Sequence, residues 1–205
     1  IIYDSKRVKL VSQGSTRLSE IREADNDRYL AWATFQQLSS GKQFFFGNIH
    51  LEPTNDAAGK TDFHNLRRKQ AQEVMASIRK NNPKNLPVIL VGDLNSYRWT
   101  APTNAPYDVF LTAGLVDHLG MAYGTQYTQP GADVERRVNT WYSSYNGYAL
   151  AAPRLKYLNG TYIDYILTTP MRMGEYENVL SVNHTTGNFI PVISGLDVPI
   201  PSDHN

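Results

Sequence analysis

The 205-residue chain contains no cysteine. This absence excludes a disulfide scaffold, thiolate metal ligands and thiol nucleophiles. A domain of this length folds without disulfides in either redox environment, so the missing cysteine leaves the cellular location open.

The chain also lacks an excess of charge of one sign. It contains 20 Lys and Arg residues and 19 Asp and Glu residues, which give a formal net charge of +1. Proteins that bind polyanions along a broad surface usually carry a clear basic excess. We therefore expect any phosphate binding by this chain to be local.

Long hydrophobic runs are missing as well. No stretch approaches the roughly 18 apolar residues of a membrane span. The opening segment, Ile1-Ile2-Tyr3-Asp4, is apolar and strand-like but lacks the basic region and apolar core of a signal peptide. The length predicts a single domain over residues 1–205.

The first half of the chain predicts an antiparallel strand pair followed by a helix. Residues 29–38 and 43–49 are rich in aromatic and β-branched side chains, and the Gly- and Ser-containing segment 39–42 joins them. Thr61 or Asp62 can cap a helix that ends near Asn82, before Pro83. Apolar residues recur along that helix at spacings of three, four and seven, namely Leu66, Ala71, Val74, Met75 and Ile78.

The remaining segments are shorter or irregular. Residues 88–91 are wholly apolar and predict a strand buried on both faces. We expect a short helix over 107–113 and strands over 162–168 and 177–183, with irregular structure over 121–159. That stretch contains four tyrosines: Tyr142, Tyr145, Tyr148 and Tyr157. Their rings either cover loops or form a surface that contacts the substrate.

Polar side chains accompany four of the apolar segments at the points where strands begin or end. A single Asp after a strand is usually a turn former, and a lone His is usually structural. Four cases in one chain predict that strand ends converge on one edge of a sheet. The segments are Asn48-Ile49-His50, Gly92-Asp93-Leu94-Asn95, Tyr162-Ile163-Asp164 and Ser202-Asp203-His204.

This set of side chains favours metal-assisted phosphodiester hydrolysis. Carboxylate and amide oxygens suit Mg²⁺ or Mn²⁺, whereas a zinc site would show tighter His and Cys clustering. Asp93 and Asn95 are two positions apart, so in an extended chain both point to one face. A His paired with a carboxylate suits proton transfer near neutral pH.

A Ser-His-Asp hydrolase is the competing enzyme class, suggested by Ser202-Asp203-His204. It is disfavoured because the chain has no G-x-S-x-G elbow and because side chains adjacent in sequence point in different directions. A P-loop and a Rossmann fingerprint are also absent from the sequence.

In order and spacing, these segments resemble the signatures of the endonuclease/exonuclease/phosphatase superfamily, also called deoxyribonuclease I-like. The resemblance spans essentially the whole chain, and Gly114-Leu115-Val116-Asp117 is similar to the family as well. It implies an α/β fold, a four-layer α/β sandwich of two packed mixed β-sheets with helices outside.

The resemblance also implies roles for individual residues. His50 and His204 correspond to the paired catalytic imidazoles, and Asp164 to the carboxylate that orients His204. Asp203 corresponds to a metal ligand. Asp93 and Asn95 would position the attacking water, the phosphate or a second metal ion, with Mg²⁺ or Mn²⁺ as the cofactor.

The chain departs from the family pattern at both ends. Family members begin with a strand carrying an Asn and a second strand ending in a Glu that ligates Mg²⁺, and they finish with a further strand after the Asp-His pair. None of these is present here, so we expect a domain truncated at both ends that binds Mg²⁺ weakly and has slight or no activity by itself.

Several substrates are compatible with the resemblance. The leading expectation is an endonuclease or exonuclease acting on DNA or RNA, and the alternative is a phosphoesterase for a lipid or inositol phosphate. A catalytically silent fragment that binds a partner is the alternative of another class. Basic residues that could contact phosphates are Arg67, Arg68, Arg98, Arg136, Arg137 and Arg154.

Overall fold

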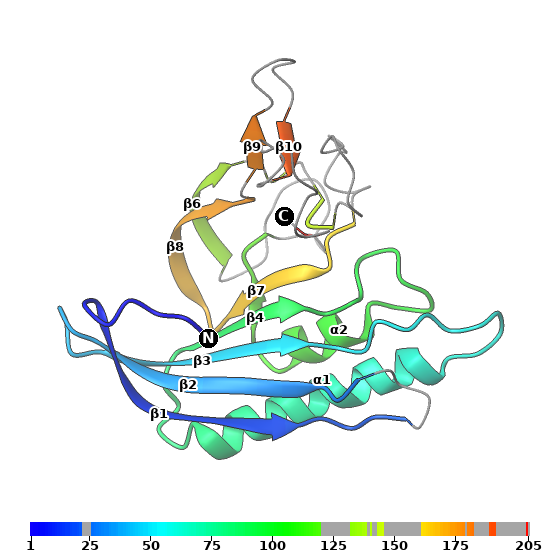
Figure 1. Ribbon diagram of the computed structural model, residues 1–205, viewed down its shortest axis with the longest axis horizontal. Coiled ribbons are helices and arrows are strands. Elements are labelled where there is room, and N and C mark those ends of the chain that lie inside the picture. The colour runs from blue at the N-terminus through cyan, green and yellow to red at the C-terminus, as the bar shows by residue number, and fades with distance from the viewer. Residues whose placement is uncertain are drawn as a thin grey trace.

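A computed structural model of the chain describes residues 1–21, 26–119, 132–138, 140, 143–145, 161–178, 180–182, 189–191 and 204. Its centre is a six-stranded mixed sheet with the strand order β1-β2-β3-β4-β7-β5 (Figure 1). The strands and helices are β1 (Val8–Arg17), β2 (Tyr29–Gln37), β3 (Gln43–His50), α1 (Asp62–Asn81), β4 (Val88–Asp93), α2 (Ala105–Thr112), β5 (Val116–Asp117), β6 (Ala132–Val138), β7 (Asp164–Thr168), β8 (Met171–Glu177), β9 (Leu180–Val182) and β10 (Phe189–Pro191).

Both helices cover the same face of this sheet. Side chains alternate along the strands, so Phe45, Ile49 and Leu90 point toward the helices and are 2% exposed or less. Val74 of α1 and Phe110 of α2 complete the same core and are fully buried. Each such side chain contributes roughly 1.5–3 kcal/mol through removal from water, which fixes the helices on this face and leaves the other face for the site.

The start of α1 differs from the prediction in its cap. The helix begins at Asp62, but Thr61 makes no side-chain cap bond. The Asp56 carboxylate instead accepts the backbone N–H groups of Phe63 at 2.8 Å and His64 at 2.9 Å. A carboxylate at this position satisfies free N–H groups and faces the positive end of the helix dipole. The segment after β3 is therefore tied to the start of α1.

The opposite face of the sheet carries a second, smaller core. Leu119, Tyr162 and Tyr176 are buried there, and Ile166 of β7 packs against them. Strands β6 and β8 pair in parallel beside this core, and β9 and β10 form a further antiparallel pair (Figure 1). Val134 of β6 and Met173 of β8 pack against this core, so the β6–β8 pair lies on the side of the sheet opposite the helices.

The elements predicted from local patterns are present with shifted ends, but three predictions are wrong. The strand expected over 177–183 is interrupted at Asn178, since β8 ends at Glu177 and β9 covers Leu180–Val182. Strand β6 lies inside the stretch expected to be irregular. The chain does not open on a strand, since Val8 is the first residue of β1 and Ile2 is fully exposed.

Strand β4 is buried less evenly than its apolar sequence predicts. Val88 and Leu90 are buried against the helices, whereas Ile89 and Val91 on the other face are only half-buried. Within the described ranges, neither helix has the length and apolar character needed to cross a membrane.

Candidate active site

Three of the predicted site residues lie side by side in one row across neighbouring strands. His50 ends β3, Asp93 ends β4 and Asp164 begins β7. The strand register pairs His50 with Asp93 and Asp93 with Asp164. Because residues paired across strands lie on one face of a sheet, the backbone ladder presents all three side chains together, on the face opposite the helices.

Gly92 allows β3 and β4 to meet closely beside this row. Its φ of +140° lies in a region that residues with a side chain rarely adopt. A Cβ atom built on Gly92 would lie 1.9 Å from the carbonyl oxygen of Ile49. Only glycine fits here, which explains why it directly precedes Asp93.

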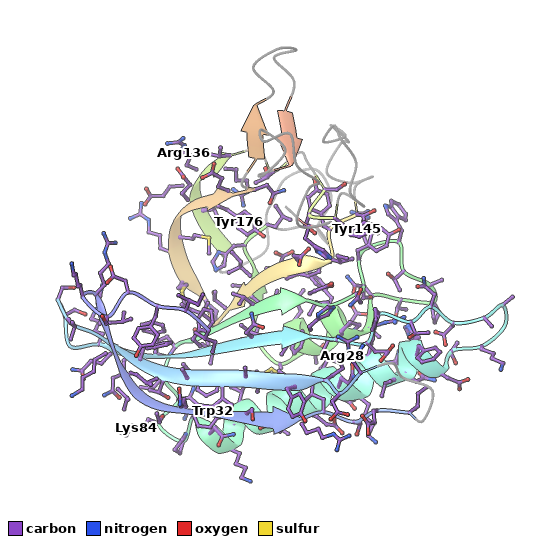
Figure 2. The ribbon with its side chains drawn as sticks, viewed as in Figure 1. Arg28, Trp32, Lys84, Arg136, Tyr145 and Tyr176 are labelled. Atoms are coloured by element: carbon purple, nitrogen blue, oxygen red, sulfur yellow. The ribbon has the colours of Figure 1, made fainter. Side chains whose placement is uncertain are left out.

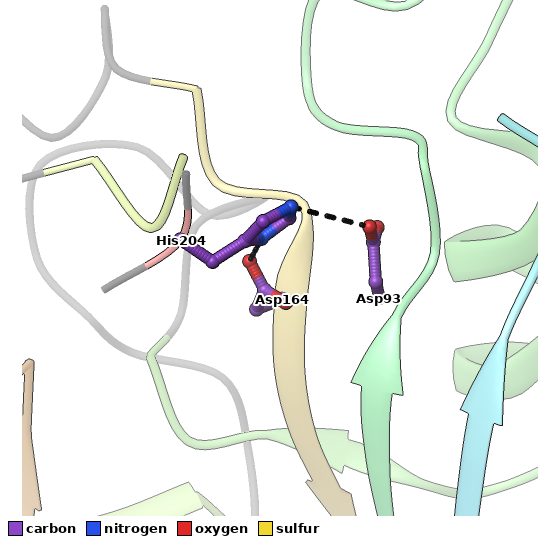
Figure 3. A group of neighbouring side chains, drawn as sticks. All are labelled: Asp93, Asp164 and His204. Atoms are coloured by element: carbon purple, nitrogen blue, oxygen red, sulfur yellow. Dashed lines mark hydrogen bonds and ion pairs between the residues drawn. The ribbon is translucent and has the colours of Figure 1, made fainter. Parts of the chain in front are cut away.

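His204 joins the row through Asp164. Its Nδ1 lies 2.7 Å from Asp164 Oδ2, and Figure 3 shows the ring placed between Asp164 and Asp93. The pairing of Asp164 with His204 expected from the sequence is therefore present. An isolated β-bridge joins His204 to Tyr145, whose ring meets the imidazole edge-on at 5.4 Å between centroids.

A serine beside Tyr145 holds the other member of the pair. Ser144 Oγ accepts the backbone N–H groups of Ile163 at 3.0 Å and of Asp164 at 3.1 Å. Residues 144 and 145 thus contact both Asp164 and His204. Figure 2 shows Tyr145 near the beginning of β7.

Asp93 is the most perturbed group of the site. Its Oδ1 accepts the backbone N–H of Asn95 at 2.6 Å, while its Oδ2 lies 3.5 Å from His50 Nε2 and 3.8 Å from His204 Nε2. Burial raises the pKa of Asp93 to about 6, and the nearby Asp164 charge acts in the same direction. Burial and the charge of Arg28 lower the pKa of His50, so this imidazole is neutral at neutral pH.

Asn95 does not extend the strand in the way the sequence predicts. Strand β4 ends at Asp93, and Asn95 has a φ of +45°. Its Nδ2 donates to the carbonyl oxygen of Leu51 at 3.0 Å, which joins the loop after β4 to the loop after β3. The extended chain expected from Asp93 to Asn95 is therefore absent, because the strand ends at Asp93 and the backbone at Asn95 is left-handed. That both side chains serve one ligand stays a prediction.

The site offers ligand atoms for a cation. One atom each from Asp93, Asp164 and His204 lie within 4.8 Å of one another. Two carboxylates at this spacing repel each other, and a bound cation would offset that repulsion. The residues present thus fit a divalent cation that prefers oxygen ligands. Asp203, the metal ligand implied by the resemblance, lies outside the described residues.

Arg28 is a site residue that the sequence reasoning missed. It precedes β2, is 9% exposed, and lies near the end of β3 (Figure 2). Its Nε has no hydrogen-bond partner among the described residues. The signal available in the sequence is its place just before a strand that pairs with the His50 strand. Ser144 was missed too, because it lies in the stretch expected to be irregular.

The arginines predicted to contact phosphates have other partners, as far as the structure describes them. Arg67 is buried and its Nη1 donates to the carbonyl oxygens of Glu52 at 3.1 Å and Thr54 at 2.8 Å. Arg136 pairs with Glu175, and Arg137 donates to the carbonyl oxygen of His118. Arg68 lies beside His64 and Arg98 lies over the Trp99 ring, and Arg154 lies outside the described residues.

A family model described as the endonuclease/exonuclease/phosphatase family matches residues 25–204. The chain belongs to this family. The matched range includes every residue of the candidate site. A comparison with curated proteins found no match.

Solved structures share the fold of the family. A mannosyl-6-phosphatase of Bacteroides thetaiotaomicron is 21% identical, with a TM-score of 0.67, and the match covers 98% of this chain and 66% of that one. The human nocturnin catalytic domain with bound sulfate anion is 18% identical over 80% of this chain and 49% of its own, with a TM-score of 0.52. A truncated Caenorhabditis elegans TDP2 is 15% identical over 90% of this chain and 63% of its own, with a TM-score of 0.50.

These similarities confirm the predicted deoxyribonuclease I-like α/β fold. The chain spans about two thirds of the length of the mannosyl-6-phosphatase and about half that of the nocturnin domain. At these identities the similarity is evidence for a shared fold and not for a shared substrate.

Proposed function

We propose that this family member hydrolyses a phosphoester at the edge formed by β3, β4 and β7. The observation that carries the proposal is the Asp164–His204 hydrogen bond of 2.7 Å, which leaves the second ring nitrogen of His204 facing Asp93. A carboxylate, an oriented imidazole and a second carboxylate at one edge form a set suited to activating water against phosphorus.

His204 is the proton-transfer group in this proposal. When Nδ1–H donates to Asp164, the lone pair of Nε2 is available to accept a proton from a water molecule, and Asp164 stabilises the imidazolium that results. The 3.8 Å between His204 Nε2 and Asp93 Oδ2 exceeds a direct hydrogen bond. A water between these atoms would be held by both groups.

His50 and Arg28 support the phosphoryl group. His50 is neutral at neutral pH because burial lowers its pKa, so it acts as a hydrogen-bonding group and not as a fixed charge. Arg28 supplies a largely buried positive charge near the end of β3, which attracts an anionic phosphoryl oxygen through its charge.

Asp93 and Asp164 are the described residues that would hold a Mg²⁺ or Mn²⁺ ion, together with Asp203 as the resemblance implies. A divalent cation bound there supplies a positive charge that compensates the phosphoryl oxygens. The chain's own contribution is to fix these carboxylates at adjacent strand ends.

For the substrate, we favour a compact phosphoester over a long nucleic acid. The net charge of +1 gives little general attraction for a polyanion. Among the arginines named above for phosphate contacts, those that the structure describes have protein partners. A mannosyl-6-phosphatase shares the fold, and we include a sugar phosphate as the first compact phosphoester to test. DNA or RNA, predicted first from the sequence, and lipid or inositol phosphates are tested beside it.

The test uses the full-length protein. Release of phosphate or of cleaved product is measured with a hexose phosphate, a nucleoside monophosphate, single-stranded DNA, RNA, sphingomyelin and an inositol phosphate, with Mg²⁺, Mn²⁺ or a chelator. We expect turnover of at least one phosphoester that the chelator and His204→Ala both abolish. Turnover unchanged in His204→Ala would remove the proposed role of this histidine.

A further inference from the structure

A hollow of about 580 Å³ lies between the loop that follows β3 and the loop that follows β4. This volume is in the range of small-molecule sites. Residues 55–61 form one wall, residues 97–102 form the other, and Arg67 of α1 also lines it. The mechanism above uses none of these residues.

The hollow adjoins the site because both loops leave from it. The Leu51 N–H donates to the carbonyl oxygen of Asp93 at 2.9 Å, and Asn95 donates back to Leu51. Tyr97, in the wall, is two residues beyond Asn95, so their Cα atoms are at most about 7 Å apart. The wall formed by residues 97–102 therefore begins four residues after Asp93 along the chain.

Trp99 is presented at the tip of a closed turn in this wall. The Tyr97 N–H donates to Thr100 Oγ1 and the Thr100 N–H donates to the Tyr97 carbonyl oxygen, each at 2.9 Å. Trp99 is 58% exposed, and the Arg98 guanidinium lies over its ring at 5.2 Å from the centroid. The two hydrogen bonds within the turn hold the exposed indole in place. A ligand ring can therefore pack on the indole with little loss of conformational entropy on binding.

Several other residues that line the hollow have hydrogen-bonding side chains. Asn55, Lys60 and Thr61 are exposed on the facing wall. Arg67 is 3% exposed, and its Nη1 donates to the carbonyl oxygens of Glu52 and Thr54, which holds the facing wall in place. The hollow thus combines the apolar Trp99 ring with several hydrogen-bond donors and acceptors. This combination suits a hydroxylated ring, whose C–H face can pack on the indole and whose hydroxyl groups can bond to the polar side chains.

We infer that this hollow binds the sugar ring of the phosphoester, with the ring packed on Trp99 and its hydroxyl groups bonded to the facing wall. The inference rests on the proposed function for the position of the phosphate. Such a ring comes either from a hexose phosphate or from the ribose of a nucleotide.

Binding is measured by calorimetry in the His204→Ala background with Mg²⁺, where turnover does not interfere. The probes are a hexose 6-phosphate, a ribonucleoside 5′-monophosphate, and ethyl phosphate, which has no ring. We expect Trp99→Ala to weaken binding of at least one sugar phosphate about tenfold or more while leaving ethyl phosphate within twofold. Trp99→Phe should keep most of the affinity.

Leu38→Ala is the matched control, because Leu38 is also a large exposed apolar side chain, 51% exposed, in the turn between β2 and β3. It should change no affinity. Equal affinity of Trp99→Ala and its parent for both sugar phosphates overturns the subsite, and so does failure of both sugar phosphates to bind while another phosphoester is hydrolysed. Trp99-dependent binding without any hydrolysis by the unmutated protein keeps the subsite and overturns the proposed function.

Discussion

Two polar clusters built from Asp and His lie on the six-stranded sheet, and they differ in how their carboxylates are satisfied. In the buried cluster, Asp117 is 0% exposed, its Oδ2 accepts the Tyr107 hydroxyl at 3.0 Å, and its Oδ1 accepts the Leu119 N–H at 2.9 Å. The adjacent His118 contacts Thr168 Oγ1 through Nε2 at 2.7 Å. Each of these bonds has ordinary hydrogen-bond length.

At the strand edge, by contrast, Asp93 uses one oxygen for the Asn95 N–H and presents the other to two imidazoles at 3.5 and 3.8 Å. Both distances are longer than direct hydrogen bonds. The comparison shows that residue type does not separate a structural cluster from a chemical one. The hydrogen bonds of the carboxylate oxygens do, because both Asp117 oxygens accept a bond of ordinary length and Asp93 Oδ2 has only the two longer contacts.

The largest expected effect is on activity at the strand edge. His204→Ala should lower kcat/KM by about 10²–10⁴-fold, as expected for loss of a general base. The melting temperature should change little, because His204 lies outside the strands of the six-stranded sheet and joins it through an isolated bridge. Steady-state kinetics and thermal unfolding test this, and a large loss of stability with intact turnover would place His204 with the structural cluster.

The next largest effect is on stability in the buried cluster. Asp117→Ala leaves the Tyr107 hydroxyl and the Leu119 N–H without their acceptor, so the free energy of unfolding should fall by about 2–5 kcal/mol. Urea denaturation measures the loss. Activity per folded molecule should be retained, and its loss would show that the two clusters are coupled.

Asp93→Asn should increase stability while removing activity. In the wild type, the Asp93 carboxyl has a folded-state pKa of about 6 against an ordinary value of 3.8. Below about pH 4 the carboxyl is protonated in both the folded and the unfolded state. As the pH rises from about 4 to about 6, the unfolded state loses this proton while the folded state keeps it. The free energy of unfolding therefore falls over this range.

The amide side chain of Asn carries no such cost. With a chelator present, the free energy of unfolding of the variant should equal that of the wild type near pH 4. Above pH 6 it should exceed the wild-type value by up to about 3 kcal/mol, because the pKa of Asp93 differs by about two units between the folded and unfolded states. Denaturation at several pH values tests the sign. A variant that is less stable at pH 7.5 would mean that the ionised carboxylate is well compensated in the fold.

The smallest expected effect concerns Ser144, which holds Asp164 in place. Ser144→Ala removes the acceptor for two backbone N–H groups and should lower the free energy of unfolding by about 1–2 kcal/mol, with a several-fold fall in kcat/KM. Ser143→Ala is the control, because Ser143 Oγ accepts the Thr161 N–H at 3.1 Å, away from Asp164. Equal kinetic losses in both variants would argue against a positioning role for Ser144.

The elements foreseen from the sequence are those whose signals are local. The β2–β3 hairpin, α1 and β4 follow from turn residues and apolar spacing within short windows. Strand β1 was not foreseen because most of its side chains are exposed and show little alternation. The β6–β8 pair depends on parallel pairing between segments far apart in the chain, for which a short window carries no signal.

For the site, the sequence supplied the residues but not their geometry. Polar groups at the strand ends predicted that His50, Asp93 and Asp164 converge, and the register places them in one row. The left-handed backbone at Asn95 was not foreseen, because asparagine tolerates several conformations. Of the four tyrosines, Tyr145 contacts His204, and the others lie outside the described residues.

The row of His50, Asp93 and Asp164 has a consequence for how the site fails on heating. These three residues belong to the central hydrogen-bonded ladder, which opens only when the sheet itself melts, whereas His204 is attached through a bridge outside that ladder. Thermal inactivation and thermal melting should therefore separate, with turnover lost at a lower temperature than the amide protection of β3, β4 and β7. On cooling, reversible inactivation would end when His204 returns to Asp164, without any refolding of the sheet.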